Sequence, residues 1–275
     1  MICVAGMPRS GTSLVTQLLH QSGLYLGPSA DMMPPSLNNT DGFWENLSFV
    51  RVNERLLASG GGTWFAPPSA LWPSPQIAGD ARAAIARFDG REPWGWKDPR
   101  NALTLSFWRQ LLPPALKVIV CIRHPAETAA SLAASTLFPR PAFRFYWPVT
   151  RGQLLRRRVA GAIRATVSAS ERSRLIYGIA LDLWRTYNAS LLEQSRGLEC
   201  LVTNYETLLG DPRRELERLC DFAGLRPSPA ALDAPKSSLR HQRAAGVPLD
   251  RTTASLYEQL CLESRKPRLR HAERL

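Results

Sequence analysis

Residues 2–13, Ile-Cys-Val-Ala-Gly-Met-Pro-Arg-Ser-Gly-Thr-Ser, join a short apolar run to a turn that contains two glycines. The apolar run, 2–5, predicts a buried strand, and the amphipathic stretch 12–21 that follows the turn predicts a helix. Two glycines five positions apart allow backbone N–H groups to surround an anion, and the helix adds the positive end of its dipole. The sequence therefore predicts a phosphate-binding loop between a strand and a helix.

This loop departs from the nucleoside-triphosphatase pattern G-x-x-x-x-G-K-[ST], whose lysine reaches the β- and γ-phosphates and whose hydroxyl holds magnesium. Thr12 stands at the lysine position, and Arg9 is the only cation in the loop. A second apolar run, 117–122, predicts a parallel strand that ends in Arg123 where triphosphatases often place a metal-binding aspartate. Ser131 follows on the next predicted helix. We therefore expect a nucleotide without a magnesium-bound γ-phosphate.

The order of apolar and amphipathic stretches predicts an α/β fold, with a parallel sheet covered by helices on both faces. A chain of 275 residues with 44% hydrophobic residues can bury one such core. We expect a single domain over residues 1–264, followed by a basic, mobile tail at 265–275. Strand patterns lie at 2–5, 94–96, 117–122 and 198–203, and helical patterns lie at 12–21, 47–58, 80–88, 101–112, 125–134, 170–194 and 212–223.

The net charge of +12 favours anionic partners such as nucleotides, acidic glycans, anionic membrane surfaces or nucleic acid, although an arginine-rich composition can also reflect coding bias. A first strand at residue 2 leaves no room for a signal sequence, which predicts a cytoplasmic location. Five cysteines without C-x-x-C pairing predict reduced core residues. Four scattered histidines give no metal-ligand spacing, so we expect no metal.

Four ordered segments resemble the sulfotransferases that use 3′-phosphoadenosine 5′-phosphosulfate (PAPS), and the resemblance spans most of residues 2–223. Residues 6–13 resemble the family's 5′-phosphosulfate loop, and 118–125 with Ser131 resemble its 3′-phosphate segment. Two further segments complete the set: Trp-Gly-Trp-Lys-Asp-Pro-Arg at 94–100 and Val-Thr-Asn-Tyr-Glu-Thr-Leu-Leu-Gly-Asp-Pro at 202–212. The resemblance implies a P-loop-like sulfotransferase fold and transfer of a sulfuryl group from PAPS to a hydroxyl or amine.

The resemblance also implies roles for the residues that bind the donor. Arg9 would bind the 5′-phosphosulfate, and Lys97 would stabilise the bridging oxygen, unless it only forms an ion pair with Asp98. Arg123 and Ser131 would bind the 3′-phosphate. Tyr205 would contact the adenine, unless it is only a core tyrosine. The remaining residues expected to contact the donor are Ser10, Gly11, Thr12 and Ser13 of the first loop and Arg240 and Arg243 of a basic loop late in the sequence.

The acceptor's proton requires a base, and cytosolic relatives carry a histidine two residues after the lysine. Pro99 stands there in this chain, so that base is missing. Bacterial relatives use a glutamate after the first helix, and Gly-Phe-Trp-Glu at 42–45 resembles their segment. Glu45 lies beside two aromatic residues that can desolvate it and raise its basicity. Glu45 could instead cap the next helix beside Asn46, and Asp41, Glu54 and Asp98 are the other candidate bases.

Three insertions rich in proline and aromatic residues, 28–44, 60–75 and 138–148, could line an acceptor pocket or act as packed lids. The basic run 151–174 is either a solvated helix face or a contact with an acidic acceptor or anionic membrane. The acceptor could be a glycan, a lipid or a small metabolite. The aromatic candidates are Trp64, Trp72, Phe143, Phe145, Tyr146 and Trp147.

Two other functions fit part of the pattern. A kinase of related fold would use ATP, but the loop lacks the lysine, and the strand at 117–122 ends in Arg123 instead of an aspartate. A basic nucleic-acid-binding protein would use the positive charge alone, but the sequence has neither glycine-aromatic RNA-binding patterns nor a recognisable reading helix. We therefore expect PAPS, its product adenosine 3′,5′-bisphosphate (PAP) and an acceptor as partners, and no nucleic acid.

Overall fold

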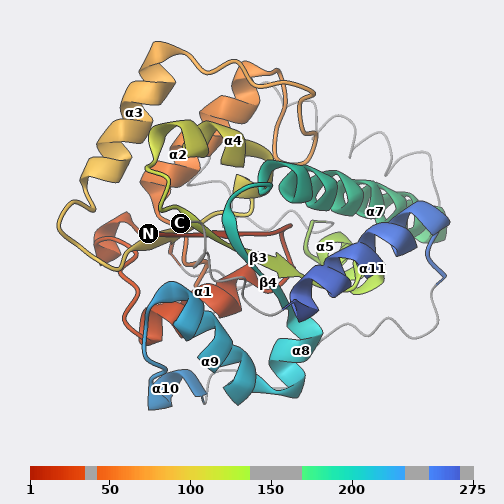
Figure 1. Ribbon diagram of the computed structural model, residues 1–275. Helices are drawn as coiled ribbons and strands as arrows, with labels where there is room; N and C mark the ends of the chain where they lie inside the picture. The colour runs from red at the N-terminus through yellow and green to blue at the C-terminus, as the bar shows by residue number, and fades with distance from the viewer. Residues whose placement is uncertain (35–41, 137–168, 233–247, 267–275) are drawn as a thin grey trace.

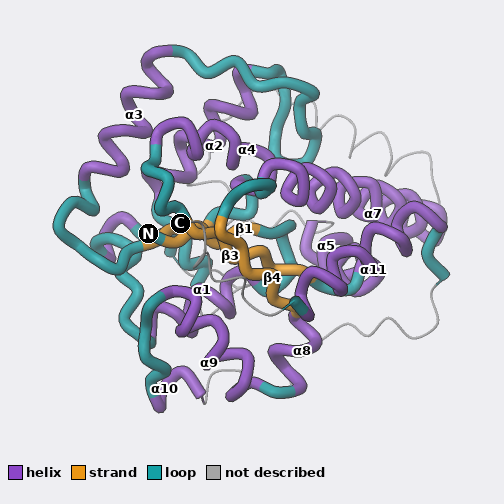
Figure 2. Tube along the Cα trace, viewed as in Figure 1, coloured by secondary structure: helices purple, strands orange, loops and turns teal. Residues whose placement is uncertain are grey.

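The computed structural model describes residues 1–34, 42–136, 169–232 and 248–266. Within these ranges four parallel strands form one sheet in the order β2-β1-β3-β4, so the first strand lies between the second and the third. Figure 2 shows β3 between β1 and β4. The register pairs Ile2 with both Gly95 and Lys117. The strands are β1 (Ile2–Ala5), β2 (Gly95–Lys97), β3 (Lys117–Ile122) and β4 (Glu199–Asn204).

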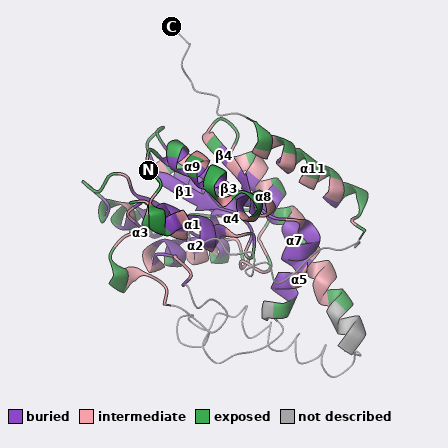
Figure 3. Cartoon of the chain, turned by 90° about the horizontal axis from the view of Figure 1, so that it is seen from below, coloured by how far each residue is buried: buried purple, intermediate pink, exposed green. Residues whose placement is uncertain are grey.

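Helices cover both faces of the sheet, with α2, α3 and α4 on one side and α1, α9 and α10 on the other (Figure 1). The apolar runs of the strands follow from this arrangement because both faces are buried. Cys3 and Ala5 of β1 pack into one core cluster, and the alternate residues Ile2 and Val4 pack into the other. Strands β1 and β3 are accordingly buried at the centre of the molecule (Figure 3), as is β2. The edge strand β4 is only partly buried. The predicted α/β fold is confirmed.

Local signals at helix ends explain several boundaries. Asn46 caps the N-terminus of α2 by accepting a hydrogen bond from Ser48 N at 3.0 Å, and Asn204 and Asp211 cap α8 and α9 in the same way. The helices are α1 (Thr12–Gln21), α2 (Leu47–Ser59), α3 (Pro75–Ala86), α4 (Asn101–Leu111), α5 (Pro125–Thr136), α7 (Ala169–Gln194), α8 (Tyr205–Gly210), α9 (Pro212–Ala223), α10 (Pro229–Leu232), α11 (Arg251–Arg265) and a 3₁₀ turn at Ser29–Asp31.

Four helices differ from the sequence prediction, and the shortest of them is α10, a four-residue helix that was not predicted. Helix α3 begins five residues earlier than expected, because Ser74 caps it and Pro75 occupies its first position. Helix α8 was not predicted, since it is only six residues long and follows a strand directly. Helix α11 was also not predicted. It contacts β4 and α7, but Thr253 and Leu260 are its only fully buried residues, so its apolar face is weak in the sequence.

Candidate active site

The loop predicted to bind phosphate lies at the carboxyl end of β1, and its two glycines fit where larger residues would not. A Cβ on Gly6 would lie 2.5 Å from the carbonyl oxygen of Cys121, so only glycine allows this approach to β3. Gly11 has φ of 91° and precedes α1 without any side-chain cap. The first N–H groups of α1 therefore face the loop without an intrahelical partner. Ser10 closes the loop by donating its hydroxyl to the carbonyl of Met7 at 2.6 Å.

Arg9 and Arg123 meet beside this loop, as the sequence predicted for two anion-binding cations. Arg9 has φ of 75°, and its Nε donates to Ser131 Oγ at 3.0 Å. Arg123 Nη1 donates to the carbonyl oxygen of Arg9 at 3.4 Å. Desolvation and then the charge of Arg123 lower the pKa of Arg9. Arg9 as a whole residue is nevertheless exposed, so solvent weakens this effect. The sequence analysis expected Arg9 at the 5′-phosphosulfate and Ser131 with Arg123 at the 3′-phosphate. In the structure Arg9 contacts both Ser131 and Arg123, so the two expected groups meet.

Two groups fix the position of the Arg123 side chain. Glu127, one turn along α5, accepts hydrogen bonds from Arg123 Nε and Nη2 at 3.2 and 3.1 Å. Arg123 also lies 4.5 Å above the centre of the Tyr205 ring, which is a cation–π contact. Burial raises the pKa of Tyr205, and Arg123 opposes that shift. The Tyr205 ring rests on Gly11, where a Cβ would lie 2.5 Å from it.

Lys97 and Glu45 form a buried ion pair at the other end of the loop. Lys97 Nζ lies 2.7 Å from Glu45 Oε1, and the two side chains are 2% and 7% exposed. The same ammonium donates to Ser13 Oγ at 3.2 Å and to the carbonyl oxygen of Phe43 at 3.0 Å. These contacts join β2, the start of α1 and the segment before α2 at one point. The two residues predicted to perform the chemistry are therefore direct partners.

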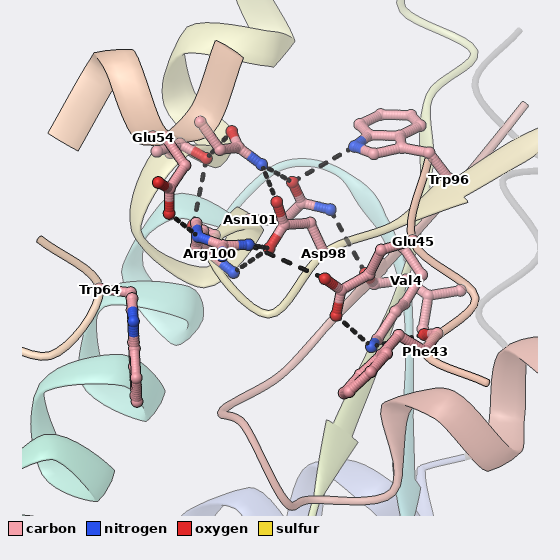
Figure 4. Close-up of polar contacts among 12 residues, drawn as sticks. Val4, Phe43, Glu45, Glu54, Trp64, Trp96, Asp98, Arg100 and Asn101 are labelled. Carbon is pink, nitrogen blue, oxygen red and sulfur yellow. Dashed lines mark hydrogen bonds and ion pairs between the residues drawn. The ribbon is translucent and has the colours of Figure 1, made fainter. Parts of the chain in front are cut away.

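Arg100 lies between three carboxylates (Figure 4). It donates from Nη1 to Asp98 at 2.7 Å and from Nε to Glu54 at 2.9 Å, and its Nη1 is 3.9 Å from Glu45 Oε2. Burial alone would lower the pKa of Arg100, but the three carboxylates, Asp98 first, raise it above its ordinary value. The alternative of a Lys97–Asp98 pair was therefore wrong, because Asp98 binds Arg100 and Lys97 binds Glu45.

Asp98 belongs to a buried hydrogen-bond network that was not predicted from the sequence. Asn53 of α2 donates to Asp98 Oδ2 and to Asn101 Oδ1, both at 2.9 Å, and its own oxygen accepts from Thr104 and from Trp108 at 2.8 Å. Asp98 and Asn53 are fully buried. Arg100 and Asp98 stand in the recognised 94–100 segment, but nothing in the sequence marks Asn53. The network fixes α2 and α4 against the strand that carries Lys97.

The segment from Gly42 to Asn46 crosses the start of α1. Trp44 adopts φ of 57°, a strained conformation for a bulky residue, directly before Glu45. Asn46, rather than Glu45, caps α2, so the capping alternative for Glu45 was wrong. Strained backbone of this kind often occurs at functional sites, and it turns the Glu45 side chain inward to Lys97.

Several predicted residues lie outside the described ranges, namely Asp41, Arg240, Arg243, the aromatics of 138–148 and most of the basic run 151–174. Trp64 is half-buried, whereas Trp72 is 69% exposed. Among the described residues no group of three or more histidine, cysteine, aspartate or glutamate side chains is arranged to hold a metal ion. Across the same ranges no helix combines the length and apolar character required to cross a membrane.

Comparison with known proteins identifies the class to which this fold and site belong. The sequence matches the sulfotransferase family over residues 2–229, so the chain is a member of that family. A search of curated proteins finds no match. The fold is similar to the sulfotransferase domain of the Synechococcus PCC 7002 olefin synthase, with a TM-score of 0.56, 19% identity, and 95% of this chain and 94% of that chain covered.

A second solved structure, the sulfotransferase domain from the curacin biosynthetic pathway, gives a TM-score of 0.54 at 18% identity, covering 95% of this chain and 97% of that chain. At this level of identity the two structures support the fold alone. The P-loop-like sulfotransferase fold implied by the sequence motifs is thereby confirmed.

Proposed function

We propose that this protein transfers a sulfuryl group from PAPS to a hydroxyl or amine of an acceptor, without a metal ion. The observation that carries the proposal is the meeting of Arg9, Arg123 and Ser131 beside a phosphate loop that lacks lysine. A nucleotide with phosphate groups at both its 3′ and 5′ ends requires fixed cations at two places rather than a magnesium site. Charge-assisted contacts of guanidinium with phosphate are short, directional and often bidentate.

At the donor end, the start of α1 would hold the 5′-phosphosulfate through backbone N–H groups. Arg123 and Ser131 would bind the 3′-phosphate, with the guanidinium kept in place by Glu127. Arg9 would lie between the two phosphates, since its side chain contacts Ser131 while its backbone belongs to the loop. Tyr205 would stack on the adenine next to Arg123, as the family resemblance implies.

At the transfer end, Glu45 would remove the proton of the acceptor hydroxyl as its oxygen attacks the sulfur. The bond from sulfur to the bridging oxygen breaks, and the electron pair stays on PAP. Lys97 would neutralise the negative charge that develops on that oxygen. To do so, its ammonium would leave Glu45 and contact the oxygen of the leaving group. The exchange frees Glu45 Oε1 to accept a proton when the donor is in place. Arg100 beside Oε2 would keep the carboxylate oriented during the exchange.

Thermal unfolding separates this proposal from a kinase. PAP should raise the melting temperature strongly, since a ligand at a hundredfold excess over its dissociation constant stabilises by about 2.7 kcal/mol. ATP with magnesium should stabilise the protein much less. Equal stabilisation by ATP, strengthened by magnesium, would overturn the proposal in favour of phosphoryl transfer. Binding to nucleic acid that falls steeply with salt and ignores PAP would instead favour a basic binding protein.

A further inference from the structure

The two ends of the site carry opposite charge among the described residues. The acceptor-side cluster, defined as Glu45, Glu54, Lys97, Asp98 and Arg100, holds three carboxylates and two cations, an excess of one negative charge. The donor end holds Arg9, Arg123 and Glu127, an excess of one positive charge. The chain as a whole carries +12. The acceptor side is therefore negative within a strongly basic protein.

Glu54 is the carboxylate of this cluster that solvent reaches. Its side chain is 21% exposed, compared with 7% for Glu45 and 0% for Asp98. Glu54 and Glu45 flank the same guanidinium, with Glu54 on Nε of Arg100 and Glu45 nearest to Nη1 (Figure 4). A molecule that presents its hydroxyl to Glu45 would therefore be separated from the Glu54 carboxylate by the Arg100 guanidinium alone. Asp98 cannot act in this way, because it is enclosed by Arg100 and Asn53.

The insertion 60–75 contributes two aromatic residues, Trp64 and Phe65. Tyr187 donates its hydroxyl to the carbonyl oxygen of Trp64 at 2.6 Å, which holds the insertion 60–75 against α7. The insertion follows directly on α2, the helix that carries Glu54. Burial raises the pKa of Tyr187, and the charges of Arg100, Asp98 and Glu54 have smaller effects on it. Trp64 and Phe65 are half-buried and pack edge to face with their centroids 5.6 Å apart.

We propose that Glu54 determines acceptor specificity by charge. The acceptor is an uncharged alcohol with an apolar or aromatic body, and Glu54 excludes acidic glycans, which the basic composition alone would favour. A carboxylate close to the reacting hydroxyl repels a second anion brought beside it, and the repulsion is strongest where the site excludes water. This inference rests on the proposed sulfuryl transfer, since it concerns the acceptor of that reaction.

Matched acceptors test the inference. The members of the pair 4-nitrophenyl β-glucoside and 4-nitrophenyl β-glucuronide differ only at carbon 6, which is the hydroxymethyl carbon in one and the carboxylate carbon in the other. Octyl β-glucoside and octyl β-glucuronide form a second pair. Binding to the PAP-saturated protein is measured by calorimetry, and transfer from labelled PAPS is measured by mass spectrometry. We expect each glucoside to be preferred at least tenfold over its glucuronide, with a preference that shrinks at high salt.

Two variants localise the effect. Glu54→Gln keeps the size of the side chain and should reduce the preference roughly tenfold, whereas Glu217→Gln, at an exposed position on α9, should leave it unchanged. If Glu54→Gln does not fold, the salt dependence of the wild-type preference decides in its place. The inference is overturned if the glucuronides bind equally or better, if Glu54→Gln leaves the preference intact, or if neither glucoside binds. Failure of PAP itself to bind overturns the proposed function instead.

Discussion

At the scale of single residues, the Lys97–Glu45 pair joins stability to chemistry. Both side chains are almost fully buried, so each neutralises a charge that would otherwise be isolated in the protein interior. The same two groups are the proposed cation and base of the reaction. A variant at either position therefore changes folding and turnover together, and the experiments have to separate the two effects.

Glu45→Gln should reduce turnover by about 10²- to 10⁴-fold, the usual contribution of a general base, with little change in PAP affinity. The amide keeps the size of the side chain but cannot take the acceptor's proton. Steady-state turnover and calorimetric PAP binding check the two halves of this prediction. Asp41→Asn and Glu54→Gln serve as parallel variants. Near-normal turnover in Glu45→Gln, with a large loss in one of the others, would move the base to that residue.

Lys97→Met should lower the free energy of unfolding by about 3–5 kcal/mol, because it leaves Glu45 buried without its closest cation. The double variant Lys97→Met with Glu45→Gln should regain part of that loss, since no uncompensated charge remains. Urea unfolding of the wild type, both single variants and the double variant forms a complete cycle. Additive losses would contradict a direct interaction between the two side chains.

At the scale of elements, the sequence predicted the strands well because their signal is local. Uninterrupted apolar runs such as 117–122 are typical of strands buried on both faces, and they appear within about one residue of the prediction. Helix α11 was missed because its stability comes from packing on β4 and α7, far away in the sequence. The site shows the same limit. Lys97 and Glu45 were recognised by their motifs, but their contact depends on how α2 lies against β2, through Asn53, which no motif marks.

Gly11 offers a test at the junction of the loop and α1. Gly11→Ala should destabilise the protein and weaken PAP binding at least tenfold, because the new Cβ would lie 2.5 Å from the Tyr205 ring and displace it. Gly61→Ala is the matched control. Its backbone is also left-handed, with φ of 76°, but a Cβ there meets nothing within 4 Å. Melting temperature and PAP affinity of both variants separate backbone strain from the clash, and equal effects would show that Tyr205 does not depend on Gly11.

At the scale of the whole molecule, the buried free cysteines should make the free energy of unfolding decrease as the pH rises into the alkaline range. Burial raises the pKa of Cys3 and Cys121, which are fully enclosed in the sheet. Cys200 is exposed, so the prediction that all five cysteines are core residues was wrong for this one. In the unfolded chain the thiols of Cys3 and Cys121 titrate near 8.5. Above that pH the unfolded state loses protons that the folded state retains, so the free energy of unfolding falls as pH rises.

Cys121→Ala should therefore flatten the alkaline decline without changing its onset. Chemical denaturation at intervals between neutral pH and about pH 11 measures the slope, which the linkage relation converts to protons released. The small cavity left by the alanine shifts all points by a constant amount, so the comparison of slopes is unaffected. An unchanged slope would show that other groups cause the decline.

The position of β1 at the centre of the sheet has a consequence for how the protein is made. Its partners are residues 95–97 and 117–120, so the strand that leads into the phosphate loop is synthesised long before either neighbour exists. Parallel pairing over such separations is slow, and an unpaired apolar strand is prone to aggregate while it waits. The proposed donor site consequently cannot form on the nascent chain until the β3 segment has left the ribosome. If the site binds nucleotide as proposed, binding at that moment would favour completion of the sheet.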